Sequence, residues 1–265
     1  MAQTRNNKIQ RAFSASADRY DAHASLHREI ADKLLAKVIK GPVPSAVLDV
    51  GCGTGYLTGR LKDQFPSSKI IGLDLAQGML EVARRKEKSI HWVLADGNNL
   101  PFSNGCFDIV ISNLAYQWAE PLSRAFFQAR RVLTLKGGLA CTLFGYHSCR
   151  ELFQSLDEAS AGALKFARLP DCSQVREALI VGGFKEPQVD CEQVKMEFNN
   201  MQELVNWFKH IGAPHLPREG YLGRACFSRA SAIYQERFAS KDGVYATFEV
   251  IWVYAKSQSH FYNGN

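Results

Sequence analysis

Three glycines stand at alternate positions, Gly51, Gly53 and Gly55, directly after the apolar segment Ala46–Val50. Glycine allows the backbone to turn sharply and lets a ligand approach the main chain closely. A strand that ends in such a turn therefore predicts a binding site for a nucleotide-like ligand. Turns of this kind serve several ligands, so the glycines alone do not identify one.

Asp49 narrows the choice of ligand. It lies two residues before Gly51, where its carboxylate would favour a cationic ligand and repel a pyrophosphate. The dinucleotide fingerprint, moreover, has its third glycine at the position where this chain has Tyr56. The pattern therefore favours a positively charged sulfonium ligand, with an NAD-dependent enzyme as the alternative.

Two further carboxylates follow the next two apolar segments. Asp74 comes roughly 20 residues after the turn, where an acidic side chain can accept hydrogen bonds from both ribose hydroxyls. Asp96 can accept a hydrogen bond from an adenine amino group, while Leu75 or Met79 packs on the ring. A single Asp after a strand is usually a helix cap, but three of them beside a glycine turn predict a ligand site.

The alternation of short apolar runs with helical patterns predicts the fold that positions these residues. The expected strands are 46–50, 69–73, 90–94, 107–112 and 138–144, and the expected helices between them are 56–64, 78–88 and 121–133. This order indicates an α/β fold with a parallel sheet covered on both faces.

The flanking regions predict helices around this core. Within 1–44 the pattern indicates two helices that break in the weakly apolar stretch 14–24, and after 146 it indicates helices at 150–164, 173–181, 201–211 and 224–238. Segments 187–198 and 245–255 predict a closing antiparallel pair. We therefore predict one domain, 1–265, with N-terminal helices (1–44), a cofactor-binding core (45–145), a helical cap (146–240) and a closing strand (241–256).

With these motifs, residues 45–145 resemble class I S-adenosylmethionine-dependent methyltransferases. The segments Phe107–Asn113 and Arg131–Gly138 add to the resemblance. It implies a Rossmann-like, seven-stranded, mostly parallel sheet with an antiparallel C-terminal hairpin, and S-adenosylmethionine as the cofactor. The residues implied to bind that cofactor are Asp49, Gly51, Cys52, Gly53, Gly55, Asp74, Leu75, Met79, Asp96, Gly97 and Asn113.

The segment after the expected fourth strand, Asn113–Trp118, carries amide and aromatic side chains and no evident acid–base pair. A hydroxyl or amine acceptor usually needs a general base, whereas a carboxylate is already anionic at neutral pH. The sequence thus favours an acceptor that brings its own charge. A base supplied by the cap is the alternative.

Three short motifs narrow the resemblance, namely Phe13 with Tyr20–His27, Asn113–Trp118, and Gly212-Ala213-x-His215. With them nearly the whole chain resembles malonyl-acyl-carrier-protein O-methyltransferases of biotin synthesis. This implies methyl transfer to the free carboxylate of a malonyl thioester on acyl carrier protein, giving the ester that primes pimeloyl synthesis. It also implies catalytic roles for Tyr20 and Gln117, which would frame the methyl group and the carboxylate, and for Arg150, which would pair with the malonyl charge.

The charge of the chain suits an acidic partner. Its formal net charge is +6, and the first forty residues hold eight Lys or Arg against four Asp or Glu. Acyl carrier proteins are acidic, so the resemblance implies docking on the basic N-terminal helix through Lys8, Arg11 and Arg28. A solvated helix face is the alternative explanation of the same charges.

The remaining composition excludes several classes. Seven scattered cysteines without a CxxC pair predict reduced thiols, no metal site and a cytoplasmic location. No apolar run reaches the roughly 20 residues of a membrane span, no secretory signal is evident, and nothing indicates a nucleic-acid partner. Two other functions stay open: a methyltransferase for another small molecule, such as a quinone or fatty acid, and a non-catalytic protein that binds S-adenosylmethionine.

Overall fold

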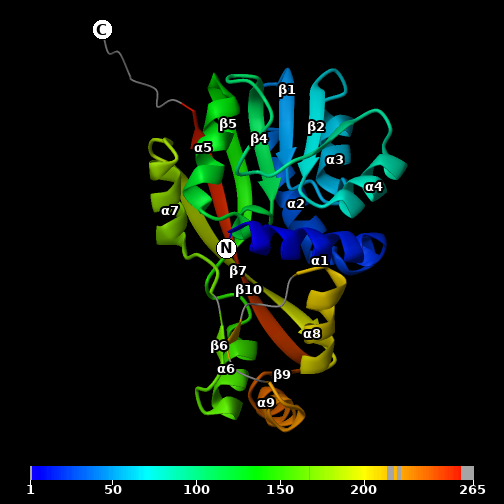
Figure 1. Ribbon diagram of the computed structural model, residues 1–265, viewed down its shortest axis with the longest axis vertical. Helices are drawn as coiled ribbons and strands as arrows, with labels where there is room; N and C mark the ends of the chain where they lie inside the picture. The colour runs from blue at the N-terminus through cyan, green and yellow to red at the C-terminus, as the bar shows by residue number, and fades with distance from the viewer. Residues whose placement is uncertain (1, 167, 214–217, 220–221, 258–265) are drawn as a thin grey trace.

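The computed structural model describes residues 2–166, 168–213, 218–219 and 222–257. Its centre is a sheet whose first five strands are connected by helices along the chain, except that a loop connects β3 to β4 (Figure 1). These elements are β1 (Ala46–Val50), α3 (Tyr56–Gln64), β2 (Lys69–Asp74), α4 (Gln77–Lys86), β3 (His91–Leu94), β4 (Phe107–Asn113), the 3-10 helix η1 (Tyr116–Trp118), α5 (Leu122–Val132) and β5 (Leu133–Phe144). The predicted core strands are all present, and β5 begins earlier than predicted.

The strand order is β3-β2-β1-β4-β5-β10-β7, where β7 is Gln188–Phe198 and β10 is Gly243–Lys256. β1 is parallel to β2 and β4, and β10 is antiparallel to both β5 and β7. The predicted seven-stranded α/β sheet is confirmed, and the short β9 (Ala239–Ser240) pairs with β10 as an additional strand. Because the strand order reverses between β1 and β4, the crevice at their carboxyl ends is where ligands usually bind.

The central strands are buried on both faces. Val47 and Leu48 are neighbours on β1 and both are fully buried, but they belong to different hydrophobic clusters. Val47 lies in the cluster of Leu34 on α2 (Ser25–Val38), whereas Leu48 lies in the cluster of Phe126 on α5. Since successive strand side chains point to opposite faces, such continuous apolar runs require helices on both sides of the sheet.

The N-terminal segment forms two helices, and the break lies at the end of the predicted stretch 14–24. α1 (Ala2–His23) is continuous through the weakly apolar residues 14–23, and only Ala24 separates it from α2. α1 crosses the strand tips and lies against α4 (Figure 1). Ala17 is buried in a cluster with Met79 of α4, and Asp18 forms an ion pair with Arg85 at 2.5 Å. Contacts with a neighbouring helix therefore stabilise turns that their own sequence supports weakly.

A second layer lies beyond the strand tips, at the bottom of Figure 1, beside the long ends of β7 and β10. It contains α6 (Arg150–Ser160), α8 (Met201–His210), α9 (Arg224–Arg237) and the short antiparallel pair of β6 (Lys165–Phe166) and β8 (Arg218–Glu219). α6 packs against α9, and α8 contacts α9, β7 and α1. We call this layer the cap, and the bounds 146–240 given from the sequence stay a prediction.

One helix of the expected cap belongs elsewhere. α7 (Cys172–Val181) packs against α5 on the main sheet, and its Val175 and Leu179 are fully buried in the cluster of Phe126. Its apolar face therefore covers the parallel sheet and does not belong to the layer beyond the strand tips. Sequence periodicity identifies the helix but not the surface that it covers.

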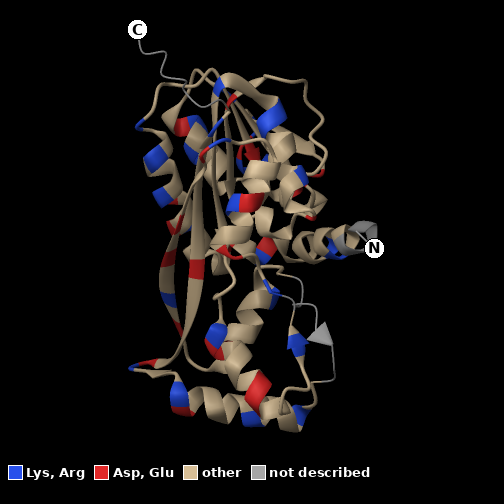
Figure 2. Cartoon of the chain, turned by 90° about the vertical axis from the view of Figure 1, so that its left-hand side faces the viewer, with Lys and Arg blue, Asp and Glu red and all other residues tan. Residues whose placement is uncertain are grey.

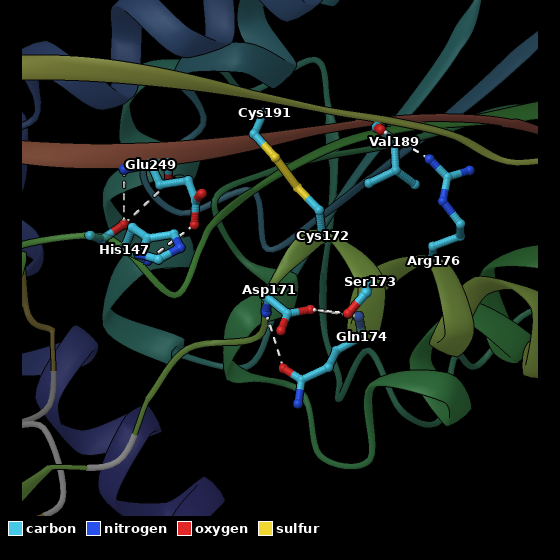
Figure 3. Close-up of a disulfide and its surroundings, with 10 residues drawn as sticks. His147, Asp171, Cys172, Ser173, Gln174, Arg176, Val189, Cys191 and Glu249 are labelled. Carbon is cyan, nitrogen blue, oxygen red and sulfur yellow. Dashed lines mark hydrogen bonds between the residues drawn. A yellow bond between two sulfur atoms is a disulfide. The ribbon is translucent and has the colours of Figure 1, made fainter.

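A disulfide joins Cys172, at the start of α7, to Cys191 on β7 (Figure 3). The prediction that every cysteine is reduced is wrong for this pair. The packing of α7 beside β7 brings together two cysteines that are 19 positions apart in the sequence. Cys52, Cys106, Cys141, Cys149 and Cys226 are free thiols.

Candidate active site

A cavity opens at the tips of the parallel strands, and we call it the strand-tip cavity. Every residue of the predicted cofactor set lines it except Asp49, Cys52 and Gly55. The lining residues from that set are Gly51, Gly53, Asp74, Leu75, Met79, Asp96, Gly97 and Asn113. α1 closes one side of the cavity with Asn6, Ile9, Phe13 and Tyr20. The sequence motifs predicted a site role for Tyr20 but not for Asn6 and Ile9.

The turn after β1 requires glycine at two positions for different reasons. Gly51 and Gly53 have φ angles of +74° and +55°, in the left-handed region that disfavours side chains. A Cβ on Gly51 would lie 2.2 Å from the Cβ of Ala115, whereas a Cβ on Gly53 would meet no atom within 4 Å. Packing therefore excludes a side chain at Gly51, and the space beside Gly53 remains open to a ligand.

Gly55 has a structural role, and its predicted contact with the cofactor stays a prediction. It precedes α3 with a φ of +85°, and it lines none of the cavities described here. A Cβ at this position would lie 2.7 Å from the ring of Trp92 on β3. The third glycine of the turn therefore makes room for an aromatic ring, which the sequence spacing does not reveal.

Asp74 connects the turn to the end of β2. Its Oδ2 accepts a hydrogen bond from the Gly53 N–H at 2.8 Å, and its Oδ1 accepts one from the Ala76 N–H at 2.7 Å. Burial raises the pKa of Asp74, and these backbone hydrogen bonds offset part of the rise. Two backbone N–H groups thus fix the Asp74 carboxylate at the position predicted to accept hydrogen bonds from ribose hydroxyls.

Asp96 is held by the loop that follows it and by α1. Its Oδ1 accepts from the Asn98 N–H and its Oδ2 from the side-chain amide of Asn6, both at 2.8 Å. Asn6 lies 90 positions away in the sequence, so only the folded chain connects the two residues. The Oδ1 of Asn98 itself is buried and has no hydrogen-bond partner among the described residues. This loop therefore presents a carboxylate and an unpaired amide oxygen at the edge predicted to receive adenine.

Asp49 lies in a smaller cavity beneath the turn, which we call the inner cavity. Tyr20, His27, Arg28, Cys52 and Asn113 also line it. The Asp49 side chain is 1% exposed, and its Oδ2 accepts a hydrogen bond from the Thr58 hydroxyl at 2.6 Å. Burial raises its pKa to about 7, an effect that the hydrogen bond from Thr58 opposes and the nearby charge of Asp74 reinforces. A cation in this cavity would favour the ionised form of Asp49.

A third, larger cavity lies between the sheet and the cap, and we call it the apolar cavity. Its lining is dominated by aromatic and aliphatic side chains, including Phe13, Trp118, Phe144, Phe153, Phe208 and Phe248. Tyr20 lines the apolar, strand-tip and inner cavities, so it stands at their junction. Burial raises the pKa of Tyr20, and the nearby carboxylates Asp74 and Asp21 raise it further. Its phenol therefore stays protonated and can donate a hydrogen bond.

Gln117 lies in the apolar cavity, as its predicted role beside an acceptor requires. Its Nε2 donates to the Leu114 carbonyl oxygen at 2.7 Å, while its buried Oε1 has no partner among the described residues. His27 also lines this cavity, but burial and the charge of Arg28 lower its pKa to about 4. Such an imidazole is neutral at physiological pH and is a weak base.

Arg150 does not line the apolar cavity, so its predicted pairing with the malonyl charge gains no support from the lining of that cavity. Its side chain is 42% exposed, lies in a separate outer cleft, and contacts Glu151 at 3.4 Å. α6 begins at Arg150, and its buried face is formed by later residues such as Leu152 and Phe153. Among the described residues, the cationic side chain that lines the apolar cavity is Arg168. No sequence motif marked Arg168, because the fold of the loop after β6 places it.

The third motif of the sequence resemblance is described only in part. Ala213 lines the apolar cavity, and Gly212 has a φ of +70°. A Cβ on Gly212 would lie 2.2 Å from the Ser16 hydroxyl of α1, so this glycine allows α8 to approach α1 closely. His215 lies outside the described residues.

Together, the strand-tip and inner cavities fit an adenosyl sulfonium ligand. The strand-tip cavity combines two carboxylates, open space beside Gly53 and apolar walls from Leu75 and Met79. The inner cavity adds the carboxylate of Asp49. Within the described ranges, no group of His, Cys, Asp or Glu could hold a metal ion, and no helix there is long and apolar enough to cross a bilayer.

We expect Asp74→Ala and Asp96→Ala each to weaken S-adenosylmethionine binding by about 1–3 kcal/mol, because a buried ligand donor would lose its acceptor. Calorimetric titration with S-adenosylmethionine and S-adenosylhomocysteine measures this. Asp63→Ala, at an exposed position of α3, is the matched control. Unchanged affinity in both site variants would contradict the assignment.

Asp49 predicts a specific pH dependence of stability. Between its unfolded pKa near 4 and its folded pKa of about 7, the native state holds a proton that the unfolded state has released. The resulting stabilisation is complete below about pH 4 and is lost as the pH rises through 7. We expect Asp49→Asn to remove this slope in urea unfolding measured across the window, and an unaltered slope would refute the shift. Asp63→Asn should leave it in place.

Comparisons with known proteins agree with this geometry. Residues 47–137 match the family model described as a methyltransferase domain. The chain is 34% identical over 259 residues to malonyl-acyl-carrier-protein O-methyltransferase of Geobacter sulfurreducens, covering 92% of this chain and 96% of that protein.

Solved structures show the same fold. The YcgJ protein of Bacillus subtilis superposes with a TM-score of 0.62 at 15% identity, over 87% of this chain and 99% of that one. The Haemonchus contortus phosphoethanolamine N-methyltransferase 2, solved in complex with S-adenosyl-L-methionine, has a TM-score of 0.54 at 20% identity, over 86% of this chain and 53% of that one. On the extent of its similarity to the curated relatives, the chain belongs to the malonyl-acyl-carrier-protein O-methyltransferase family.

Proposed function

We propose that the protein transfers a methyl group from S-adenosylmethionine to the free carboxylate of a malonyl thioester carried by acyl carrier protein. The product is the methyl ester that the sequence resemblance associates with the start of pimeloyl and biotin synthesis. The observation that carries the proposal is the meeting of a carboxylate-lined cavity and an apolar cavity at Tyr20, where the imidazole that lines the apolar cavity, His27, is neutral and weakly basic.

A carboxylate acceptor suits this junction. S-adenosylmethionine supplies a methyl group on a positively charged sulfur, which keeps the electron pair of the broken C–S bond. The carboxylate oxygen supplies the pair for the new C–O bond and is already ionised at neutral pH, so no proton has to be removed. The chain then has to align the acceptor and exclude water. The aromatic walls of the apolar cavity exclude water, and the neutral Tyr20 phenol can donate a hydrogen bond that orients the carboxylate.

Gln117 and Asn113 complete the proposed positioning. Asn113 donates from Nδ2 to the His27 carbonyl oxygen at 2.9 Å and accepts the Thr142 hydroxyl at 2.8 Å, so its side chain is fixed between α2 and β5. Gln117 is fixed by its bond to Leu114. Neither amide brings a full charge, and so neither would hold the carboxylate in an ion pair strong enough to reduce its nucleophilicity.

The proposed docking surface for the acidic carrier is the exposed face of α1. Lys8 and Arg11 are exposed there, whereas the nearby Asp21 forms an ion pair with Lys86 of α4. Arg28 does not belong to this surface, because it is half-buried in the inner cavity and donates to the Asp21 carbonyl oxygen. The proposed docking surface therefore includes Lys8 and Arg11 but not Arg28.

A cytoplasmic location is part of the same proposal. Five cysteines are free thiols, which suits a reducing compartment. The bond between Cys172 and Cys191 is the observation that weighs against it.

The direct test is incubation of the purified protein with S-adenosylmethionine and malonyl-loaded carrier protein. Mass spectrometry should find the mass of one added methyl group, and alkaline hydrolysis should remove it as expected for an ester. The apolar cavity would also accept a quinone or fatty acid, so these acceptors and free malonate belong in the same assay. Faster methylation of any of them than of the thioester would overturn the proposal.

Charge reversal on α1 tests the docking surface. We expect Lys8→Glu combined with Arg11→Glu to raise the apparent KM for the carrier-bound substrate, and to do so more at low salt, where exposed charges are less screened. The kcat should change little because both residues lie outside the apolar cavity. Steady-state kinetics at two ionic strengths measure this, and a KM that responds to neither salt nor mutation would exclude the surface.

A further inference from the structure

The apolar cavity continues into an outer cleft on the cap, which the methyl-transfer reaction by itself does not explain. The outer cleft is lined by His147, Arg150, Phe153, Gln154, Asp157, Leu164, Lys165, Phe166 and Arg168. Phe153, Phe166 and Arg168 line the apolar cavity as well, so the two spaces adjoin at these side chains. A long substrate could therefore occupy both at once.

The outer cleft is basic. Its described lining includes three basic side chains, Arg150, Lys165 and Arg168, and one carboxylate, Asp157, and Arg150 also contacts Glu151. Figure 2 shows basic residues, with some acidic ones, on the cap between the N-terminal helix and the lowest helix, and mostly acidic residues along the long strands. The cleft thus favours an anion beside an otherwise apolar passage.

Arg168 is held in place at the boundary of the two spaces. Its guanidinium lies 4.8 Å from the ring centroid of Tyr146 and 5.8 Å from that of Phe153. Such cation–π contacts orient the side chain. A guanidinium held in this way can still present its N–H groups to two oxygens of a phosphate.

We propose that the outer cleft binds the phosphodiester of the carrier's phosphopantetheine arm, with Arg168 as the principal contact. The inference rests on the proposed function. A malonyl thioester on this arm has an anion at each end, a carboxylate and a phosphate, with a largely uncharged chain between them. The carboxylate has to reach the junction at Tyr20, so the chain crosses the apolar cavity and the phosphate meets the outer cleft.

The positions of the lining residues favour an arm that has its phosphate in the outer cleft and its malonyl carboxylate at Tyr20. Arg168 lines the outer cleft but not the strand-tip cavity, whereas Tyr20 lines the strand-tip cavity but not the outer cleft. A carboxylate paired with Arg168 would be held at the end of the apolar cavity away from the carboxylate-lined site. A phosphate at Arg168 leaves the malonyl carboxylate free to reach Tyr20.

Two thioesters that differ by one phosphate test the proposal. Malonyl-phosphopantetheine should have a KM about tenfold or more below that of malonyl-pantetheine with the wild-type enzyme, since the phosphate gains charge-assisted hydrogen bonds. Arg168→Gln should abolish most of this ratio, because it should raise the KM for malonyl-phosphopantetheine much more than the KM for malonyl-pantetheine. Arg168→Lys keeps the charge but loses the planar guanidinium group, so it should retain part of the ratio between the two KM values.

Arg229→Gln is the matched control, because Arg229 is an exposed arginine on α9 that lines neither space. It should leave the ratio unchanged. Equal KM values for the two thioesters in the wild type, or an equal loss for both in Arg168→Gln, would overturn the assignment of the phosphate.

A binding measurement separates this inference from the proposed function. Calorimetric titration of the wild type with phosphopantetheine and with pantetheine, neither carrying an acyl group, should detect tighter binding of the phosphorylated compound, and Arg168→Gln should remove the difference. If no thioester is methylated, the proposed function fails whatever this titration finds. If methylation occurs but the phosphate has no effect on KM or on binding, only the outer-cleft assignment fails.

Discussion

The attachment of the glycine turn to the end of β2 is the constraint on which the site depends. The N–H groups of Gly51 and Cys52 both donate to the Leu73 carbonyl oxygen, at 2.7 and 3.0 Å, and the Gly53 N–H donates to the Asp74 carboxylate. These bonds fix the turn in a conformation in which a side chain at position 51 would clash with Ala115. They also hold Asp74, so one small network shapes the backbone of the cavity and orients a carboxylate within it.

The three cavities differ in the charge of their lining residues, and this difference suits the proposed methyl transfer. Carboxylates are concentrated in the strand-tip and inner cavities, where a cationic ligand would stabilise them and where burial disfavours their ionised forms. The adjoining apolar cavity is lined by a protonated phenol and a neutral imidazole, and Arg168 stands at its far end. Such an arrangement suits transfer from a cation to an anion, because each reactant brings its own charge to a cavity of low polarity.

α1 couples the two halves of the molecule. Its early residues Asn6 and Ile9 line the strand-tip cavity, Tyr20 lies at the junction, and its end at His23 accepts a hydrogen bond from the Trp207 indole of α8 at 2.9 Å. A single helix therefore contacts the cofactor side, the acceptor side and the cap. Movement of α1 would change the access to all three, so its ion pairs with α4 contribute to the site as well as to the fold.

The sequence by itself determined the sheet, the glycine turn and the carboxylates at the strand tips, because strand periodicity, glycine geometry and the position of a residue at a strand end are local properties. It also indicated the family through short motifs. The tertiary structure decided which surface each helix covers, which is why α7 joins the sheet and α1 continues through a weak segment. It likewise placed Gly55 against Trp92, Arg150 in the outer cleft and Arg28 in the inner cavity, and it revealed Asn6 and Arg168. Those assignments depend on contacts between residues far apart in the chain, and such contacts leave no periodic signal in the sequence.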